Sequence, residues 1–174
     1  GCNLYDKEIL NLAAKESGFC TKFFEQHDEH KGFFKSLIHI HTPLFSDNNF
    51  YNNKFSQESL FQFQSDAIRK AADEQSCVFV GRCADYVLRD YKNVVNIFIT
   101  ADMDQRIKNV CKRQKCDRAT ARKAITTGES DRASYYNYYT GKKWGHSSSY
   151  DLCINSSLLG MEETEKIIAE FIRK

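Results

Sequence analysis

Short apolar runs alternate with longer amphipathic segments along most of the chain. The runs at 77–80 (CVFV), 94–100 (VVNIFIT) and 150–155 (YDLCIN) predict β-strands, and residues 3–5 (NLY) predict the end of another. The first two runs carry no charge, which is typical of parallel strands covered on both faces. Strands that alternate with helices predict an α/β fold, built as a three-layer α/β/α sandwich around a parallel sheet.

Helical spacing of apolar residues accounts for much of the remaining sequence. A first helix is expected to begin at Asp6 and to end at Gly18, and two short helices are expected within residues 20–41. Residues 42–55 contain the only proline and four asparagines, which predicts a loop.

A long helix should follow this loop, because Ser56 is a good N-cap and apolar residues then recur at helical spacing to about Gln75. Three more helices are predicted in the second half of the chain. They should begin at Asp102, span residues 117–139, and follow Gly160.

A chain of 174 residues can bury a sizeable core within one domain. No uncharged stretch approaches the ~18 residues needed to cross a membrane, and no signal peptide opens the sequence, so no membrane association is expected. The seven cysteines are scattered and include no Cys-x-x-Cys, which favours a reduced, cytoplasmic protein.

A charged pair follows the strand predicted at residues 77–80. The strand stops at Gly81, and Arg82 and Asp85 come within the next four residues. Ligands of open α/β sheets collect at the carboxyl ends of the strands, where a guanidinium matches a phosphate and a carboxylate accepts from an amino group or a ribose. A surface ion pair would produce the same spacing, and the two interpretations have equal weight.

Positive charge is concentrated in the segment 106–143. Eleven basic and three acidic residues give this segment a net charge of +8, so the rest of the chain, whose total is +2, carries −6. Such a segment predicts an anionic partner, either the phosphates of a nucleotide or a nucleic acid. For any single arginine a solvated helix face is the simpler explanation, whereas the clustering favours a function for the set.

Other chemistry-bearing residues give weaker signals. The histidines of HDEH (27–30) and HIH (39–41) have no complete set of metal ligands around them, so no protein metal site is predicted. Cys83 has no partner pattern for nucleophilic catalysis and is expected to fill space. Trp144, among lysines, is either a stacking surface or the anchor of a hinge.

Several segments resemble known nucleotide kinases. Gly81-Arg82, the run 96–101 (NIFITA) and Arg106 resemble the pattern of bacterial cytidylate kinases, in which a strand ends in Gly-Arg-Asp and a later strand precedes a helix with an arginine. The segments VGRCADYVLRD, RASYYNYYTGKKWG and YDLCINSS resemble more closely the cytidylate kinase-like family of bacterial proteins. The likeness covers nearly the whole chain. It implies a single kinase-like domain over residues 1–174 with the P-loop nucleoside monophosphate kinase fold, a helical monophosphate-binding insertion at about 18–55 and a lid at about 116–145.

This resemblance assigns roles to residues that would bind the acceptor phosphate and to residues of the lid. Arg82 matches the arginine that binds the acceptor phosphate. Arg106 matches the arginine after the next strand, and Arg132 matches the lid arginine. The acid three residues before the lid arginine is usually aspartate. Here it is Glu129, with Asp131 as an alternative.

Two more acids fall near the implied acceptor site. Asp6 matches the aspartate that closes the second strand. Asp85 has no direct counterpart, because Cys83 stands where the Gly-Arg-Asp pattern has its aspartate. Arg118 and Arg122, in the implied lid, are the residues expected to contact ATP.

The phosphate-binding loop of this fold is not found in the sequence. No Gly-x-x-x-x-Gly-Lys-Ser/Thr occurs in the 174 residues. The loop would follow a first strand and precede the helix that leads to residues 1–6. Either that strand and loop lie before Gly1 in the full gene product, which we expect, or the protein lacks them, in which case it should not use ATP well.

The resemblance implies a phosphotransferase that uses ATP and Mg²⁺ and moves the γ-phosphoryl group to a nucleoside monophosphate. CMP or dCMP is the leading expectation for the acceptor. A second hypothesis is a nucleotide sensor of the same fold without turnover, which Glu129 and the absent phosphate loop favour. A third is a nucleic-acid-binding protein using the basic segment, which ranks last because the remainder of the chain is acidic.

Overall fold

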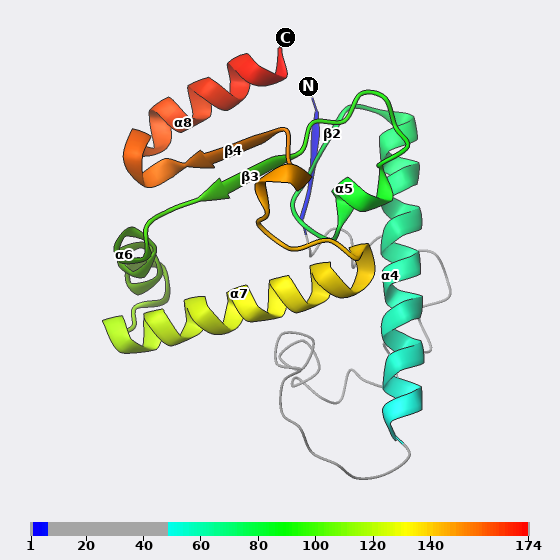
Figure 1. Cartoon of the computed structure of the whole chain (residues 1–174), viewed down its shortest axis with the longest axis horizontal. Helices are drawn as coiled ribbons and strands as arrows, with labels where there is room; N and C mark the ends of the chain where they lie inside the picture. The colour runs from blue at the N-terminus through cyan, green and yellow to red at the C-terminus, as the bar shows by residue number, and fades with distance from the viewer. Residues whose placement is uncertain (1, 7–48, 174) are drawn as a thin grey trace. The chain divides into compact units, whose positions relative to one another are not determined.

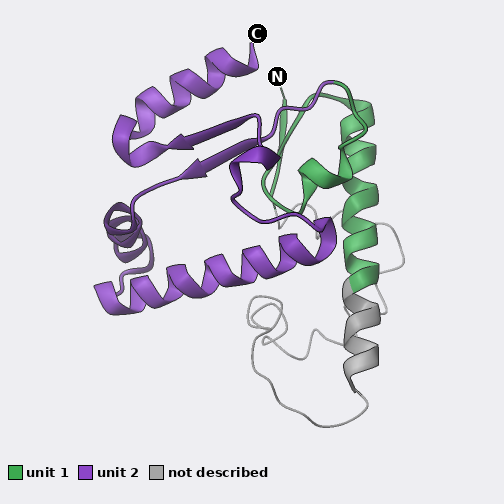
Figure 2. Ribbon diagram, viewed as in Figure 1, with its two compact units in different colours: residues 1–92 green, residues 93–174 purple. Residues whose placement is uncertain are grey.

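The computed structural model describes the backbone of residues 2–6 and 49–173 and the side chains of 2–6 and 58–173. The chain divides into two compact units, residues 1–92 and 93–174 (Figure 2). Each unit contains a two-stranded parallel sheet together with helices. The α/β class is therefore confirmed, whereas the three-layer P-loop sandwich stays a prediction. The helices predicted within 6–18 and 20–41 lie outside the described residues.

The sheet of the first unit joins β1 (Asn3–Tyr5) to β2 (Cys77–Phe79), as Figure 1 shows. Tyr5 lies opposite Phe79, and their rings stack with centroids 5.3 Å apart. The long helix α4 (Asn49–Glu74) leads into β2, and the short helix α5 (Ala84–Val87) follows it. Both strands thus occur where the apolar runs predict them.

One face of α4 forms the core of this unit. Leu60, Gln64, Ile68 and Ala71 recur at helical spacing and are all buried, with Ile68 fully enclosed. Helix α5 contacts α4 and adds Ala84, Val87 and Leu88 to the buried set.

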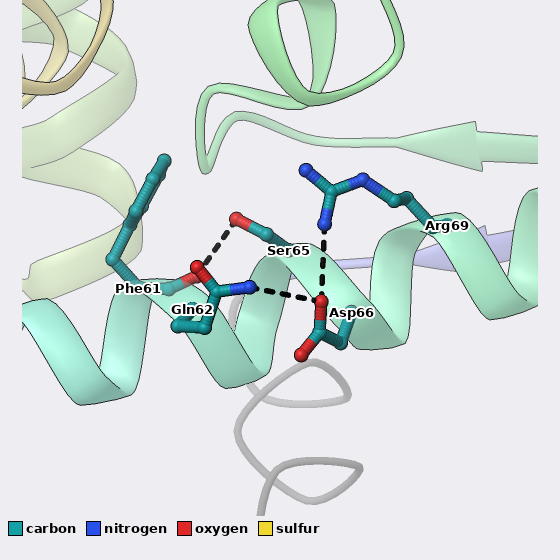
Figure 3. A network of polar contacts seen from close by, with 5 residues as sticks. All are labelled: Phe61, Gln62, Ser65, Asp66 and Arg69. Carbon is teal, nitrogen blue, oxygen red and sulfur yellow. Dashed lines mark hydrogen bonds and ion pairs between the residues drawn. The ribbon is translucent and has the colours of Figure 1, made fainter.

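Several polar side chains of α4 form hydrogen bonds with other residues of the same helix (Figure 3). The buried Ser65 hydroxyl donates to the Phe61 carbonyl oxygen at 2.8 Å. Asp66 Oδ1 accepts from Gln62 Nε2 at 3.1 Å and from Arg69 Nη1 at 3.0 Å. These last groups are exposed, so this network contributes little to stability.

Helix α4 begins seven residues earlier than predicted. It starts at Asn49 and not at Ser56, so the predicted loop is wrong for residues 49–55. Helix propagation adds one hydrogen bond for each residue fixed, and a nucleated helix therefore extends through residues of poor propensity until a stop signal.

The predicted double coverage of the strands is wrong for several side chains. Val78 is 45% exposed, Val80 56% and Ile99 56%. The thiol of Cys77 donates to the Ala71 carbonyl oxygen, so one face of β2 lies against α4. Successive side chains point to opposite faces, and no described element of this unit covers the side with Val78.

The second unit pairs β3 (Ile97–Thr100) with β4 (Leu152–Asn155) in parallel. Both strands begin later than predicted. The residues that precede them, Asn96 and Asp151, form hydrogen bonds with each other instead of continuing the strands. Asn96 N donates to the Asp151 carboxylate at 2.7 Å, and Asp151 N donates to the Asn96 carbonyl oxygen at 2.8 Å. This exchange fixes the start of the sheet.

The helices of the second unit are α6 (Met103–Gln114), α7 (Arg118–Thr140) and α8 (Ser156–Ile172), with the 3₁₀ turn η1 (Ser147–Ser149) before β4. Asp117 caps α7 by accepting from Thr120 N at 2.8 Å, and Gly141 ends it with a left-handed backbone. Asp102 occupies the N-cap position of α6, as predicted, but its carboxylate accepts from Asn155 Nδ2.

Helix α8 differs from its prediction. It begins at Ser156, where the Asn155 side chain accepts from Ser157 N at 3.0 Å. The backbone of Gly160 then departs from helical geometry, with φ 77° and ψ 167°. Gly160 therefore separates a short first helical segment from the longer one, and the predicted helix does follow Gly160.

Candidate functional site

The turn after β2 has an unusual backbone. Gly81, Arg82 and Cys83 are consecutive residues with positive φ angles of 74°, 56° and 56°. Ala84 N donates to the Gly81 carbonyl oxygen at 3.2 Å and closes the turn. A left-handed backbone costs a residue with a Cβ roughly 1–2 kcal/mol, and such strain is concentrated at functional sites. The turn that carries Arg82 is thus the leading candidate in this unit.

Strand pairing brings three predicted residues to one end of the sheet. Val80 N donates to the Tyr5 carbonyl oxygen at 2.9 Å, so Asp6 and Gly81 both emerge at the carboxyl ends of β1 and β2. Arg82 follows directly, and Asp85 lies in the first turn of α5. Both are half-buried. Three residues therefore lie at the edge where ligands of α/β sheets bind. They are Asp6, Arg82 and Asp85, which the sequence predicts to bind the acceptor nucleotide.

Cys83 is part of the core in this turn. It is 3% exposed, and burial raises the pKa of its thiol to about 12, with Asp85 raising it further and Arg82 lowering it. The thiol is neutral at physiological pH and is not a nucleophile. Cys83 fills space, as predicted.

The second unit holds the other arginines on α6 and α7. These helices pack through Ile107, Ala121 and Ile125. Arg106 precedes Ile107, and Glu129 lies one turn beyond Ile125 on the same face of α7. Their side chains form an ion pair with 2.7 Å between Arg106 Nη1 and Glu129 Oε1, at 25% and 34% exposure. Two residues predicted to act in catalysis are thus in direct contact.

A second ion pair joins the same two helices. Arg118 Nη2 lies 2.7 Å from Asp104 Oδ1, and both side chains are well exposed. Arg122 and Arg132 are also exposed, and neither forms an ion pair with any residue that the structure describes. The Arg132 guanidinium lies against α7, where a Cβ at Gly128 would be 3.4 Å from Nη1. Of these arginines, Arg122 and Arg132 are the ones available to an anionic ligand.

The two acidic candidates on α7 have different surroundings. Glu129 is bound to Arg106, whereas Oδ2 of the half-buried Asp131 is enclosed and accepts no hydrogen bond from the described residues. A buried acceptor without a donor costs about 1–3 kcal/mol. Asp131 therefore has a carboxylate oxygen, Oδ2, that can still accept a hydrogen bond.

An aromatic cluster, which the sequence did not resolve, anchors the segment after α7. The Phe98 ring meets Trp144 edge-on at 5.3 Å and Tyr150 at 4.9 Å between centroids. Trp144 N donates to Asn137 Oδ1, and Gly145 N donates to the Tyr150 hydroxyl. Trp144 is thus held against β3 as an anchor. The signal in the sequence was the aromatic spacing of Trp144 and Tyr150 around a glycine.

The described residues offer no ready-made metal site. They contain no group of three or more His, Cys, Asp or Glu side chains able to hold an ion. The histidines at 27, 30, 39 and 41 lie outside this part of the chain. In the same part, no helix has the length and apolar character to span a membrane.

These residues define a mixed α/β protein with an arginine turn at the end of a parallel strand and a basic pair of crossed helices. The chain belongs to the cytidylate kinase-like family, whose model matches residues 1–158. This confirms the resemblance found in the sequence.

One similar solved structure is also an α/β protein. It is the crystal structure of an uncharacterized protein from Eubacterium ventriosum ATCC 27560, with 29% sequence identity and a TM-score of 0.72. The match covers 99% of this chain and 84% of that one. None of the curated proteins matches the chain.

Proposed function

We propose that the protein is a nucleotide kinase-like phosphotransferase that moves the γ-phosphoryl group of ATP to a nucleoside monophosphate, with CMP or dCMP as the leading acceptor. Membership of the cytidylate kinase-like family supports this reaction class. The observation that carries the site is the convergence of Asp6, Arg82 and Asp85 on one end of the β1–β2 sheet, next to a strained turn. Arg82 would bind the acceptor phosphate, with the two acids beside it.

The basic residues of the second unit suit the other half of this reaction. Phosphoryl transfer depends mainly on positioning and on positive groups around the developing charge. Arg106 would hold the acceptor phosphate with Arg82, Arg132 would stabilise the developing charge, and Arg118 and Arg122 would contact ATP. No general base is required, because the second pKa of a phosphate monoester is about 6 and the acceptor is largely ionised at neutral pH.

Mg²⁺ would enter this site with ATP. Because the described residues contain no cluster of three protein ligands, they fit an ion held mainly by phosphates and water, which is how Mg²⁺ commonly binds in kinases. The ion would neutralise phosphate charge. The protein's own contribution is to orient both nucleotides and to exclude water.

Replacing Arg82 tests the acceptor site. Arg82→Ala should weaken CMP binding by about 10- to 150-fold, since hydrogen bonds to a charged group are worth about 1.5–3 kcal/mol, and it should leave ATP binding nearly unchanged. Isothermal titration of the full-length protein measures both affinities. Arg89→Ala is the matched control, because Arg89 is an exposed arginine of the same unit that lies over the Tyr86 ring. Unchanged CMP affinity in Arg82→Ala would contradict the assignment.

A second candidate function is a nucleotide sensor that binds without turnover. The specific observation in its favour is that Arg106 and Arg118 are neutralised by Glu129 and Asp104. A coupled assay of the full-length protein against a panel of nucleoside monophosphates separates the two functions. Phosphoryl transfer to any of them supports the kinase, whereas binding of a monophosphate with no product at any concentration supports the sensor.

The ion pair also predicts an effect on CMP. Glu129→Gln removes the carboxylate that competes for Arg106, and a pair of this exposure is worth up to about 1 kcal/mol, so CMP should bind about fivefold more tightly. Glu163→Gln is the control, because Glu163 forms an ion pair with Lys166 on α8, outside the proposed site. If both variants bind CMP like the wild type, Arg106 does not hold the acceptor phosphate.

A further inference from the structure

Two cysteines of the second unit are brought together at the turn between α6 and α7. Cys111 lies in the last turn of α6, and Cys116 follows the helix by two residues. Between them, Lys115 has a left-handed backbone with φ 52° and ψ 44°. In such a helix end, the residue after the left-handed one turns back against the last helical turn. The fold therefore places Cys116 over Cys111.

The surroundings of the two thiols agree with this placement. Both side chains are half-buried, both pack against the cluster of Ile107, Ala121 and Ile125, and both are free thiols. The two side chains are near enough for Cys111 to influence the ionisation of Cys116. Burial, followed by the neighbouring Cys111 and Asp117, raises the pKa of Cys116. The two thiols therefore share one half-buried site at the turn between α6 and α7.

The charge around this pair favours one class of oxidant. From Gln105 to Cys116 the sequence contains five basic residues and no acid, and those at 108, 112, 113 and 115 are exposed. An anionic small-molecule disulfide is attracted to such a surface. Glutathione disulfide has this charge and this chemistry.

We propose that Cys111 and Cys116 form a dithiol modification site that glutathione disulfide converts to an intramolecular disulfide. One cysteine thiolate attacks a sulfur of glutathione disulfide and releases one glutathione, and the other thiolate then displaces the second glutathione. The two thiol protons end on the two glutathione molecules formed. One S–S bond is made in the protein and one is broken in the oxidant.

The cross-link has a mechanical consequence that rests on the proposed function. It closes a ring over residues 111–116 and fixes the turn that joins α6 to α7, at the start of the predicted lid. A fixed turn limits the movement of that lid. The cross-link itself can form whether or not the protein is a kinase.

Peptide mapping tests the cross-link directly, because Lys112, Arg113 and Lys115 lie between the cysteines. The full-length protein is incubated with glutathione disulfide, its remaining thiols are alkylated, and it is digested with trypsin without reduction. We expect residues 109–112 (NVCK) and 116–118 (CDR) as one disulfide-linked species, in a protein about 2 Da lighter at this site. Glutathione adducts or free thiols at both cysteines, with no linked peptide, would overturn the proposal.

Cysteine-to-serine variants and a second thiol reagent provide the controls for this experiment. Cys111→Ser and Cys116→Ser should each abolish the linked peptide, whereas Cys153→Ser, which removes an exposed cysteine of β4, should retain it. If a serine variant does not fold, phenylarsine oxide replaces it, since this trivalent arsenical bridges two neighbouring thiols. It should protect Cys111 and Cys116 of the wild-type protein from alkylation together. Independent alkylation of the two would contradict the proposal.

Discussion

At the scale of single residues, two glycines after α7 allow the cost of backbone strain to be distinguished from the cost of a steric clash. Gly141 and Gly145 have similar positive φ angles of 67° and 72°. A Cβ at Gly141 would meet nothing within 4 Å, whereas one at Gly145 would lie 3.1 Å from Phe98 Cζ. The Phe98 ring is itself held by Trp144 and Tyr150, so it cannot move aside freely.

Gly145→Ala should therefore lower the free energy of unfolding more than Gly141→Ala. Each substitution should cost about 1 kcal/mol for a residue with a Cβ at positive φ, and Gly145→Ala should cost about 1–3 kcal/mol more for overpacking. Urea unfolding of both variants measures the difference. Equal destabilisation of the two variants would show that the aromatic cluster yields to the added methyl group.

At the scale of the element, α7 depends on the N-cap at Asp117. Hydrogen bonds from the Thr120 main chain and hydroxyl lower the pKa of the Asp117 carboxyl below its usual 3.8. A lowered pKa in the folded state means that the ionised cap stabilises the protein above pH 3.8. This contribution is lost as the pH falls through the folded value.

Asp117→Ala should accordingly have a lower melting temperature than the wild type at neutral pH, and the difference should narrow below pH 3.8. Thermal unfolding followed by circular dichroism across this range is the measurement. Asp117→Asn serves as the control, because its amide oxygen can still accept from Thr120 N but does not titrate. A gap between alanine and wild type that stays constant with pH would rule out the charged cap.

At the scale of the whole molecule, the residues assigned to the proposed function belong to both compact units. Asp6, Arg82 and Asp85 belong to residues 1–92, and Arg106, Glu129 and Arg132 belong to residues 93–174 (Figure 2). The ion pairs of Arg106 and Arg118 also reduce the positive charge that the basic segment offers to a nucleic acid.

CMP and a non-hydrolysable ATP analogue should each raise the unfolding temperature of the full-length protein. Each ligand at 100 times its dissociation constant should add about 2.7 kcal/mol to stability. Scanning calorimetry with each ligand alone and with both gives the comparison. No shift with either nucleotide would argue against both the kinase and the sensor.

Local sequence signals were sufficient where a single residue ends an element. Asp117 and Gly141 bound α7 through a cap and a left-handed backbone, both of which depend only on residue type and near neighbours. The strands at Asn3–Tyr5 and Cys77–Phe79 were found from apolar runs. The loop predicted through residue 55 was wrong in part, because the extension of α4 depends on cooperative propagation.

The sequence also placed Gly81, Arg82 and Asp85 directly after a strand, and its likeness to the cytidylate kinase-like family is confirmed. What only the tertiary structure decided are contacts between residues far apart in the chain. These include the burial of Gln64 in the α4 core, the pairing of Arg106 with Glu129 and the packing of Trp144 on Phe98. Such contacts depend on how helices cross and how strands pair, which composition and periodicity do not specify.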